Sequence, residues 1–203
     1  MSKLAILILS FCIATFAQTA NHSSKAKSSK SGNTADSMFL KKAAQGNMAE
    51  VAMGKLATQN AQSDDVKKFG QRMVDDHSKA EQDLEGVASK NNLTVPQDVN
   101  AQQKAEQQKM EKMKGAAFDR AYMAMMVKDH TKDVAEFKKE ADSTSANADL
   151  RDYAKRTYPT LDDHLTNAKA VNDALPKTGA KSGKNHAKPT ATSPSGGPGL
   201  LLI

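Results

Sequence analysis

Cysteine and aromatic residues are scarce in this sequence of 203 residues. The single cysteine, Cys12, lies inside an apolar run, so the rest of the chain has no thiol for a disulfide, a redox pair or a nucleophile. Tryptophan is absent and aromatic residues make up 4% of the chain, which leaves few rings for stacking on bases or sugars. We therefore expect no binding of nucleic acid.

Motifs of several common enzyme classes are also missing. The sequence contains no glycine-rich phosphate loop, no Gly-x-Ser-x-Gly elbow and no His-Glu-x-x-His pair. These absences do not decide whether the chain is an enzyme, but they favour a protein without catalytic turnover. A metal-dependent redox enzyme stays open as a third alternative, because it needs none of these motifs.

The N-terminal residues 1–20 have the layout of a secretory signal peptide. Lys3 precedes an apolar run over 4–16, and small residues follow at Ala17 and Ala20. The run has about 13 residues, whereas a helix that crosses a bilayer needs about 20. We expect cleavage at one of the two alanines, a periplasmic or secreted protein, and no transmembrane anchor after cleavage.

The basic excess of the chain lies in two polar segments that flank its centre. The formal net charge is +6, but residues 36–175 are nearly balanced. Segments 21–35 and 176–203 are rich in Lys, Ser and Gly or Asn, and have too few apolar side chains to offset the entropy of folding. We expect both to be disordered and to give at most a weak attraction to anionic surfaces. One folded domain remains, at 36–175, and its envelope partners are unknown.

The composition of 36–175 favours helices, because it is mostly Ala, Lys, Gln, Glu, Asp, Met and Leu, without β-branched runs. Periodicity predicts long helices over 36–60, 64–90, 116–141 and 148–174, and a short polar helix within 100–114. Asp36 is the expected N-cap of the first helix, and Pro159 is an expected kink. This order predicts an antiparallel four-helix bundle with a short extra helix in the long crossover.

Three of the long helices carry one histidine near the middle of their apolar stripe. These are His77, His130 and His164, and each directly follows an aspartate. On the first helix, Glu50 stands at the corresponding depth when residues are counted back from the hairpin turns. An antiparallel bundle is therefore expected to bring four polar groups to one level of its core.

The sequence resembles the bacterial domain-of-unknown-function family numbered 4142. The resemblance rests on an ordered set of segments: FLKKAAQGNMAEV at 39–51, QRMVDDHS at 71–78, GAAFDRAY at 115–122, DH at 129–130, and PTL at 159–161 before His164. It implies an exported protein with a ferritin-like four-helix bundle. The di-iron pattern of ferritin-like proteins needs a Glu-x-x-His on two helices. Val74 and Leu161 stand where those glutamates belong, so a di-iron centre is not expected.

The metal hypothesis assigns Glu50, His77, His130 and His164 to one divalent ion. Three imidazoles and one carboxylate suit Zn²⁺ and also Cu²⁺ or Fe²⁺. Other side chains are candidates for a supporting role around these ligands: Asp76, Asp129, Asp163, Met73 and Met126. The alternative is a non-catalytic structural or interaction module, in which the histidines are hydrogen-bonded core residues and no metal binds.

Overall fold

The computed structural model describes residues 34–177, and every regular element in this part of the chain is an α-helix. The helices are α1 (Thr34–Asn60), α2 (Asp64–Lys90), α3 (Ala101–Glu111), α4 (Gly115–Ala141) and α5 (Ala148–Ala174). The predicted all-α fold is confirmed, and α5 is continuous through Pro159. The expected signal peptide, most of the linker 21–35 and nearly all of the tail 176–203 lie outside the described residues.

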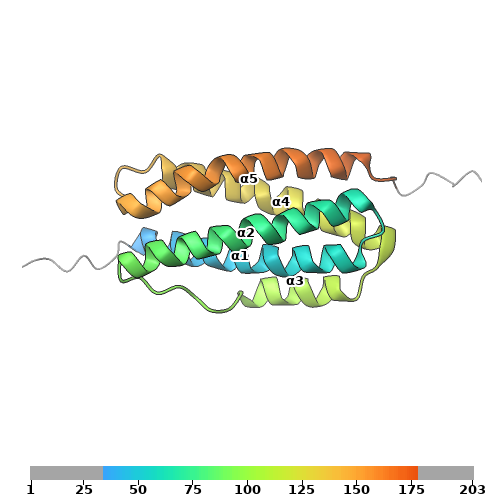
Figure 1. Cartoon of the computed structure of the whole chain (residues 1–203), viewed down its shortest axis with the longest axis horizontal. Coiled ribbons are helices and arrows are strands. Elements are labelled where there is room, and N and C mark those ends of the chain that lie inside the picture. The colour runs from blue at the N-terminus through green and yellow to red at the C-terminus, as the bar shows by residue number, and fades with distance from the viewer. Residues whose placement is uncertain (1–33, 178–203) are drawn as a thin grey trace, which may run out of the picture. The chain divides into compact units, whose positions relative to one another are not determined.

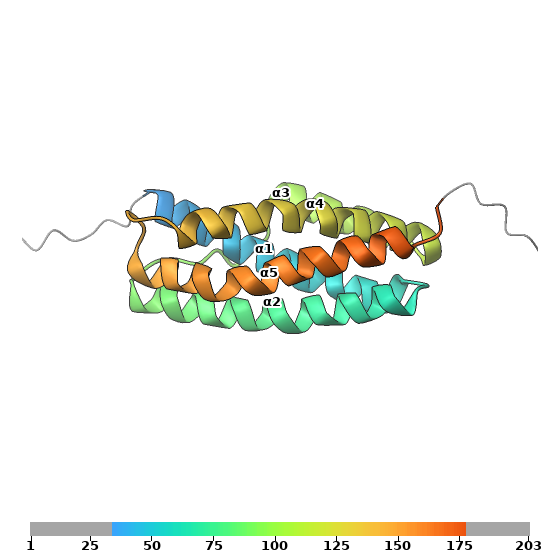
Figure 2. The same cartoon turned by 90° about the horizontal axis from the view of Figure 1, so that it is seen from above.

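Two antiparallel hairpins make up the bundle. Helix α1 packs along α2, and α4 packs along α5 (Figure 1). The hairpins meet where α2 contacts α5 and α1 contacts α4, so the four long helices enclose one core (Figure 2). Helix α3 lies in the connection between the hairpins and packs on the outside of α1 and α4. This is the predicted bundle with a short helix in its crossover.

The start of α1 differs from the prediction. The helix begins at Thr34, so Asp36 lies within its first turn and the prediction of Asp36 as N-cap is wrong. The Asp36 side chain is buried, and its Oδ1 accepts a hydrogen bond from the backbone N–H of Asn147 at 3.1 Å. Asn147 is the N-cap of α5. Asp36 therefore connects the start of α1 to the start of α5.

The short helix α3 has its own N-terminal cap. The Asn100 side chain accepts a hydrogen bond from the backbone N–H of Gln103, and the Gln103 side chain accepts one from the backbone N–H of Asn100. This reciprocal pair satisfies two backbone donors that the first turn leaves free. Gly115, with φ of +62°, then starts α4 in a left-handed conformation that favours glycine.

A layer of buried polar side chains divides the core into two apolar clusters. One cluster includes Phe39, Leu84 and Phe137, and the other includes Phe69 and Met126. Each long helix has one or two buried polar residues between the segments that contribute to the two clusters. These residues are Asn47 and Glu50 on α1, His77 on α2, His130 on α4 and His164 on α5. The polar layer is therefore shared by all four helices.

Two glycines set the close contact between α1 and α2. A Cβ atom placed on Gly54 would lie 2.5 Å from the carbonyl oxygen of Gly70, and a Cβ on Gly70 would lie 2.5 Å from the Cβ of Ala57. Carbon atoms do not approach other heavy atoms so closely without displacement, so only glycine fits at both positions. This contact fixes how the two helices are aligned along their axes.

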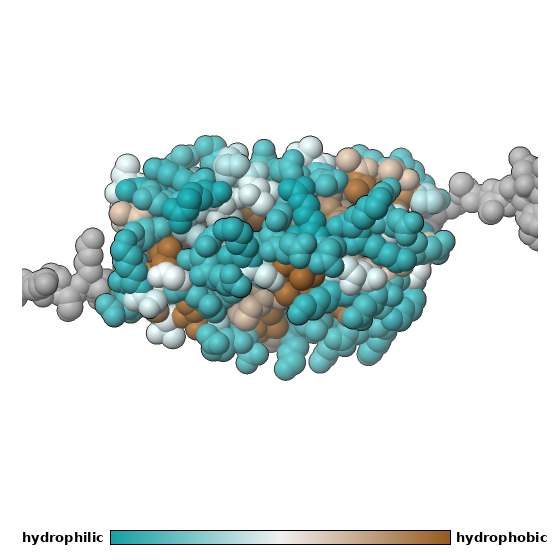
Figure 3. Space-filling view, viewed as in Figure 1, coloured by the Kyte–Doolittle hydropathy of each residue, from teal (hydrophilic) through white to brown (hydrophobic). Residues whose placement is uncertain are grey.

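The surface of the bundle is polar. The face seen in Figure 3 is mostly hydrophilic, with small separate hydrophobic spots. Among the described residues, Met38 is the exposed large hydrophobic residue, with a relative exposure of 54%. No helix within residues 34–177 combines the length and the apolar character needed to span a membrane.

Candidate metal centre

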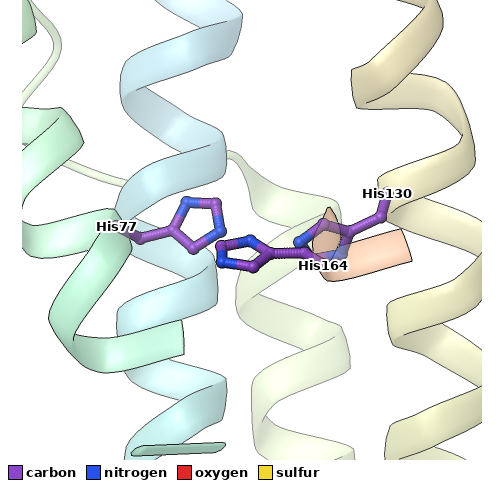
Figure 4. Close-up of side chains that lie close together, drawn as sticks. All are labelled: His77, His130 and His164. Carbon is purple, nitrogen blue, oxygen red and sulfur yellow. The ribbon is translucent and has the colours of Figure 1, made fainter. Parts of the chain in front are cut away.

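His77, His130 and His164 project toward one another from α2, α4 and α5 (Figure 4). Their side chains are almost completely buried, with 3%, 0% and 1% exposure. The ring centroids are 5.3–5.7 Å apart, and one ring nitrogen from each residue lies within 4.8 Å of the others. The polar layer of the core thus contains a compact group of three imidazoles.

Each imidazole is held by a hydrogen bond from one of its two ring nitrogens to an oxygen atom. His77 Nδ1 lies 3.0 Å from Oδ1 of Asn47, and His130 Nδ1 lies 3.0 Å from the carbonyl oxygen of Met126. His164 Nε2 lies 2.7 Å from Oδ2 of Asp76. Each oxygen accepts, so the ring nitrogen that faces it carries the proton. The other nitrogen of each ring then presents a lone pair.

The orientation of Asn47 supports this assignment for His77. The Asn47 Nδ2 atom donates to a carboxylate oxygen of Glu81 at 3.1 Å, so the amide oxygen is the atom that faces His77. A carboxylate accepts hydrogen bonds and cannot donate one when ionised. The position of Glu81 therefore fixes the amide, and the amide fixes the imidazole.

Within residues 34–177, the three remaining ring nitrogens have no hydrogen-bond partner. They are Nε2 of His77, Nε2 of His130 and Nδ1 of His164, and all three are buried. A buried acceptor without a partner costs about 1–3 kcal/mol. Three such atoms lie in one layer of the core, so together they destabilise the folded state. A bound metal ion would remove this destabilisation. The residues present therefore fit a metal ion.

The three imidazoles are electrically neutral at pH 7. Burial lowers the pKa of His77 well below its usual value, and the neighbouring His130 and His164 lower it further. Burial together with His164 lowers the pKa of His130 to about 4, although its hydrogen bond to Met126 opposes this effect. Burial also lowers the pKa of His164, although its hydrogen bond to Asp76 opposes this effect. Neutral imidazole is the form that binds a metal.

A second network supports His164 from the surface. The Asp76 carboxylate that contacts His164 also accepts from Nε of Arg72 at 3.2 Å. Arg72 in turn pairs with Asp163 through a guanidinium nitrogen at 2.7 Å. Asp76 belongs to α2 and His164 to α5, so this network also joins the two hairpins. Asp163 itself pairs with Arg72, and its charge also acts on the imidazole of His164.

Glu50 is not part of the histidine group. It is buried, with 5% exposure, but its carboxylate does not fall within the distance that joins the three ring nitrogens. The reason is the alignment of α1 and α2: Asn47, one helical turn before Glu50, is the residue that faces His77. The Gly54–Gly70 contact lies about two helical turns beyond Asn47, toward the connection between α1 and α2. This contact fixes the alignment of the two helices.

The remaining sequence candidates have other contacts. Asp129 lies 3.9 Å from Lys132 in a weak ion pair, and it is not hydrogen-bonded to a histidine. Met73 and Met126 are buried in the apolar cluster next to the histidines, where Met126 supplies its backbone oxygen to His130. Sequence reasoning missed Asn47 and Arg72. Asn47 lies on the buried face of α1. A polar side chain on that face was the signal that could have identified it as a residue of the site.

The arrangement suits a transition-metal ion bound by three nitrogens. Bonds of about 2.1 Å place tetrahedral ligands about 3.4 Å apart, so the rings would draw together slightly around an ion. Three protein ligands leave one position for water or another small ligand. Imidazole is a good ligand for zinc, copper and iron, so the donor set alone does not distinguish these metals.

Comparison with known proteins gives a family and a fold. The family model described as "Domain of unknown function (DUF4142)" matches residues 20–171. No curated protein matches the sequence. A similar solved structure is a DUF305 fragment from Deinococcus radiodurans, with a TM-score of 0.62 and 12% identity. The match covers 71% of this chain and 99% of the fragment, and it supports the helical fold alone.

Proposed function

Because the chain belongs to the DUF4142 family, whose description names no activity, its own geometry has to indicate its role, and we propose that it binds one divalent transition-metal ion. The ligands are the unpaired ring nitrogens of His77, His130 and His164. The metal is zinc, copper or iron, because all three accept imidazole ligands. The protein holds this ion in the cell envelope, in storage, sensing or protection.

The three buried nitrogens without partners carry this proposal. Each ring is anchored by a hydrogen bond on its other nitrogen, which fixes both the ring orientation and the proton position. Metal-binding histidines commonly show this arrangement, in which an outer oxygen accepts from the ring. Burial keeps the rings neutral, so protons compete weakly with a metal at neutral pH.

The alternative is a structural module in which the same histidines are satisfied core residues. That role requires partners for the inner ring nitrogens, which could be Glu50, a hydroxyl group or a buried water molecule. The structure shows no hydrogen bond between Glu50 and a histidine in the described residues, and Glu50 Oε2 is itself without a partner. This pattern favours the metal centre over the structural module.

The surroundings of the centre support binding of an ion more than turnover of an organic substrate. The cavity next to His77 has a volume of about 20 Å³. A cavity of this size holds about one water molecule or one ion. A single ion or one water molecule at the open position fits such a space.

Export is the second part of the proposal. It is supported by the layout of residues 1–20, with Lys3, a short apolar run and small residues at its end. Mass spectrometry of the protein isolated from its own cells tests this point. A chain that begins near residue 18 or 21 is expected, and membrane-bound protein with an intact Met1 would contradict it.

Calorimetric titration of the metal-free, untagged protein with Zn²⁺ or Cu²⁺ tests the metal proposal. We expect one ion per chain and a gain in stability of about 2.7 kcal/mol when free metal is 100 times Kd. The variants His77→Ala, His130→Ala and His164→Ala should lose this gain while still melting cooperatively. The control His186→Ala, outside the described residues, should keep it.

A protein that melts cooperatively but binds no ion near neutral pH would favour the structural module. If the protein does bind an ion, elemental analysis of the protein from its native compartment identifies the metal. Iron, copper and zinc are distinguished directly by this measurement.

A further inference from the structure

A cleft rich in carboxylates opens between α1, α3 and α4. Its volume is about 350 Å³, and it lies on the side of α1 and α4 that α3 partly covers. Five acidic residues from the three helices line it: Glu50, Glu106, Asp129, Asp133 and Glu136. The same cleft contains two lysines, Lys42 and Lys132. The carboxylates outnumber the lysines, so the cleft carries negative charge when they are ionised.

Three of the five carboxylates have no ion-pair partner among the described residues, and one of these, Glu106, accepts a hydrogen bond from the uncharged Gln102 side chain. Lys42 pairs with Glu136 at 2.6 Å, and Lys132 lies 3.9 Å from Asp129. Glu50 and Asp133 have no ion pair or hydrogen bond to any side chain among the described residues. Glu50 is also 95% buried, since its exposure is 5%, and its Oε2 atom has no partner. A buried acceptor at the wall of a cleft is a site for a cation.

These carboxylates attract a cation but do not enclose one as ligands. Among the described residues, the three histidines are the group of potential ligands whose atoms come within 4.8 Å of one another. No three carboxylates of the cleft meet this distance. Charges spread along a cleft raise the local concentration of cations without trapping them in one place.

The cleft adjoins the cavity that reaches His77. The small cavity shares four lining residues with the cleft, namely Lys42, Gly46, Asp133 and Glu136. It is also lined by Asn47 and His77, so its inner end reaches one of the three histidines. Asp133 and Gly46 therefore stand at the passage from the cleft to the histidines.

We infer that this acidic cleft is the access route by which a hydrated divalent cation reaches the three histidines. The negative charge of the cleft attracts the ion, Glu50 presents a buried oxygen atom to it, and Gly46 leaves the passage open because it has no side chain. This inference rests on the proposed metal function, since it describes how the same centre is filled. It also gives Glu50 a role, although Glu50 is not in the histidine group.

Substitution of Gly46 tests the route directly. A Cβ atom on Gly46 would meet no atom within 4 Å, so a larger side chain can enter the free space without disturbing the helix. Leucine is also more favourable than glycine inside a helix. The Gly46→Leu variant should fold normally and narrow the passage. Gly86→Leu is the matched control, because Gly86 is also helical with free space and is not a lining residue of the cleft.

The measurement is the rate at which metal-free protein takes up Co²⁺ in a stopped-flow experiment, followed by the visible absorption of the imidazole complex. Uptake in Gly46→Leu should be slower than in the unmodified protein by about tenfold or more. The leucine side chain would fill the passage, and closely packed side chains leave little room for an ion. Release to a chelator should slow by a similar factor, so that Kd stays nearly constant. Gly86→Leu should not change either rate.

Charge variants test the attraction separately. Uptake by Asp133→Asn at pH 8 and low salt should be about tenfold slower, and should depend less on ionic strength, than uptake by the unmodified protein. Glu85→Gln removes one charge from an exposed position on α2 and serves as control. Circular dichroism and thermal melting confirm that the variants are folded.

Two different failures are distinguishable. If the unmodified protein binds no Co²⁺ at equilibrium, the proposed function and the route both fail. If the centre fills with normal affinity but Gly46→Leu and Asp133→Asn take up Co²⁺ as fast as their controls, the route alone is wrong. The ion then arrives elsewhere, for example along the α2–α5 contact beside Asp76.

Discussion

Asn47 Oδ1 lies 3.0 Å from His77 Nδ1 in the interior of the bundle. The amide group of Asn47 is in turn oriented by Glu81, to which it donates. This chain of contacts determines that His77 presents Nε2 to the other two histidines. An uncharged side chain on α1 therefore controls the ligand atom on α2.

The first prediction follows from this contact. Asn47→Ala removes the acceptor that orients His77, so the ring can turn and protonate either nitrogen. We expect the affinity for Zn²⁺ to fall by about 10- to 100-fold, which is typical when a hydrogen bond behind a metal ligand is lost. Competition with a chelator of known affinity measures the change.

Asn60→Ala is the matched control for this experiment. Asn60 is also a buried asparagine on α1, and it bonds to Lys114 near the opposite end of the helix from Thr34. Its loss should lower the stability of the fold without changing the affinity for metal. Equal losses of affinity in both variants would show that Asn47 acts through stability alone.

The second prediction concerns Asp76, which accepts from His164 at 2.7 Å. Asp76→Asn keeps the shape of the side chain but removes the negative charge that makes the imidazole a stronger ligand. The affinity for Zn²⁺ should fall by about tenfold. Asp75→Asn is the control, because Asp75 is exposed and accepts a hydrogen bond from Gln71 on its own helix. An affinity in Asp76→Asn equal to that of the control would contradict a role for Asp76 at the centre.

The third prediction concerns the α1–α2 contact. Gly54→Ala places a methyl group 2.5 Å from the Gly70 carbonyl oxygen, so the helices must separate. The free energy of unfolding should fall by about 1–3 kcal/mol, as is common when a packed contact is overfilled. Gly86→Ala has free space and should raise it by about 0.5–1 kcal/mol. Urea unfolding of both variants measures these opposite changes.

Much of the fold follows from local patterns in the sequence. The bounds of α2 and α5 match the predicted ranges, because charged first turns, asparagines and polar connections mark both ends. Periodicity also placed His77, His130 and His164 on buried faces, where the structure has them. The family resemblance is confirmed by the match over residues 20–171.

The register between helices was the part that sequence could not give. Glu50 was placed opposite the histidines by counting residues from the hairpin turn, but a count cannot show where two helices approach most closely. The tight contact at Gly54 and Gly70 sets that alignment, and it brings Asn47 to His77. The Asp36 prediction failed for a related reason, since its partner Asn147 is distant in sequence.

The last prediction is a dependence of stability on pH that originates at Asp133. Burial raises the pKa of this carboxyl group to about 7, and the nearby Asp129 and Glu136 raise it further than Lys132 and Lys42 lower it. In the unfolded chain the group has an ordinary pKa of about 3.9. Between these values the folded protein binds more protons, so the carboxyl group favours folding at low pH. This contribution is lost as the pH rises through about 7.

Asp133→Asn removes this dependence. Metal-free Asp133→Asn should therefore gain stability over the unmodified protein as the pH is raised from 4 to 8. Each unit of pKa shift corresponds to about 1.4 kcal/mol, but the side chain is only partly buried, so we expect a relative gain of about 1–2 kcal/mol. Urea unfolding at both pH values measures it, with Glu85→Gln as the exposed control. A difference between Asp133→Asn and the unmodified protein that is the same at pH 4 and pH 8 would show that Asp133 ionises normally in the folded chain.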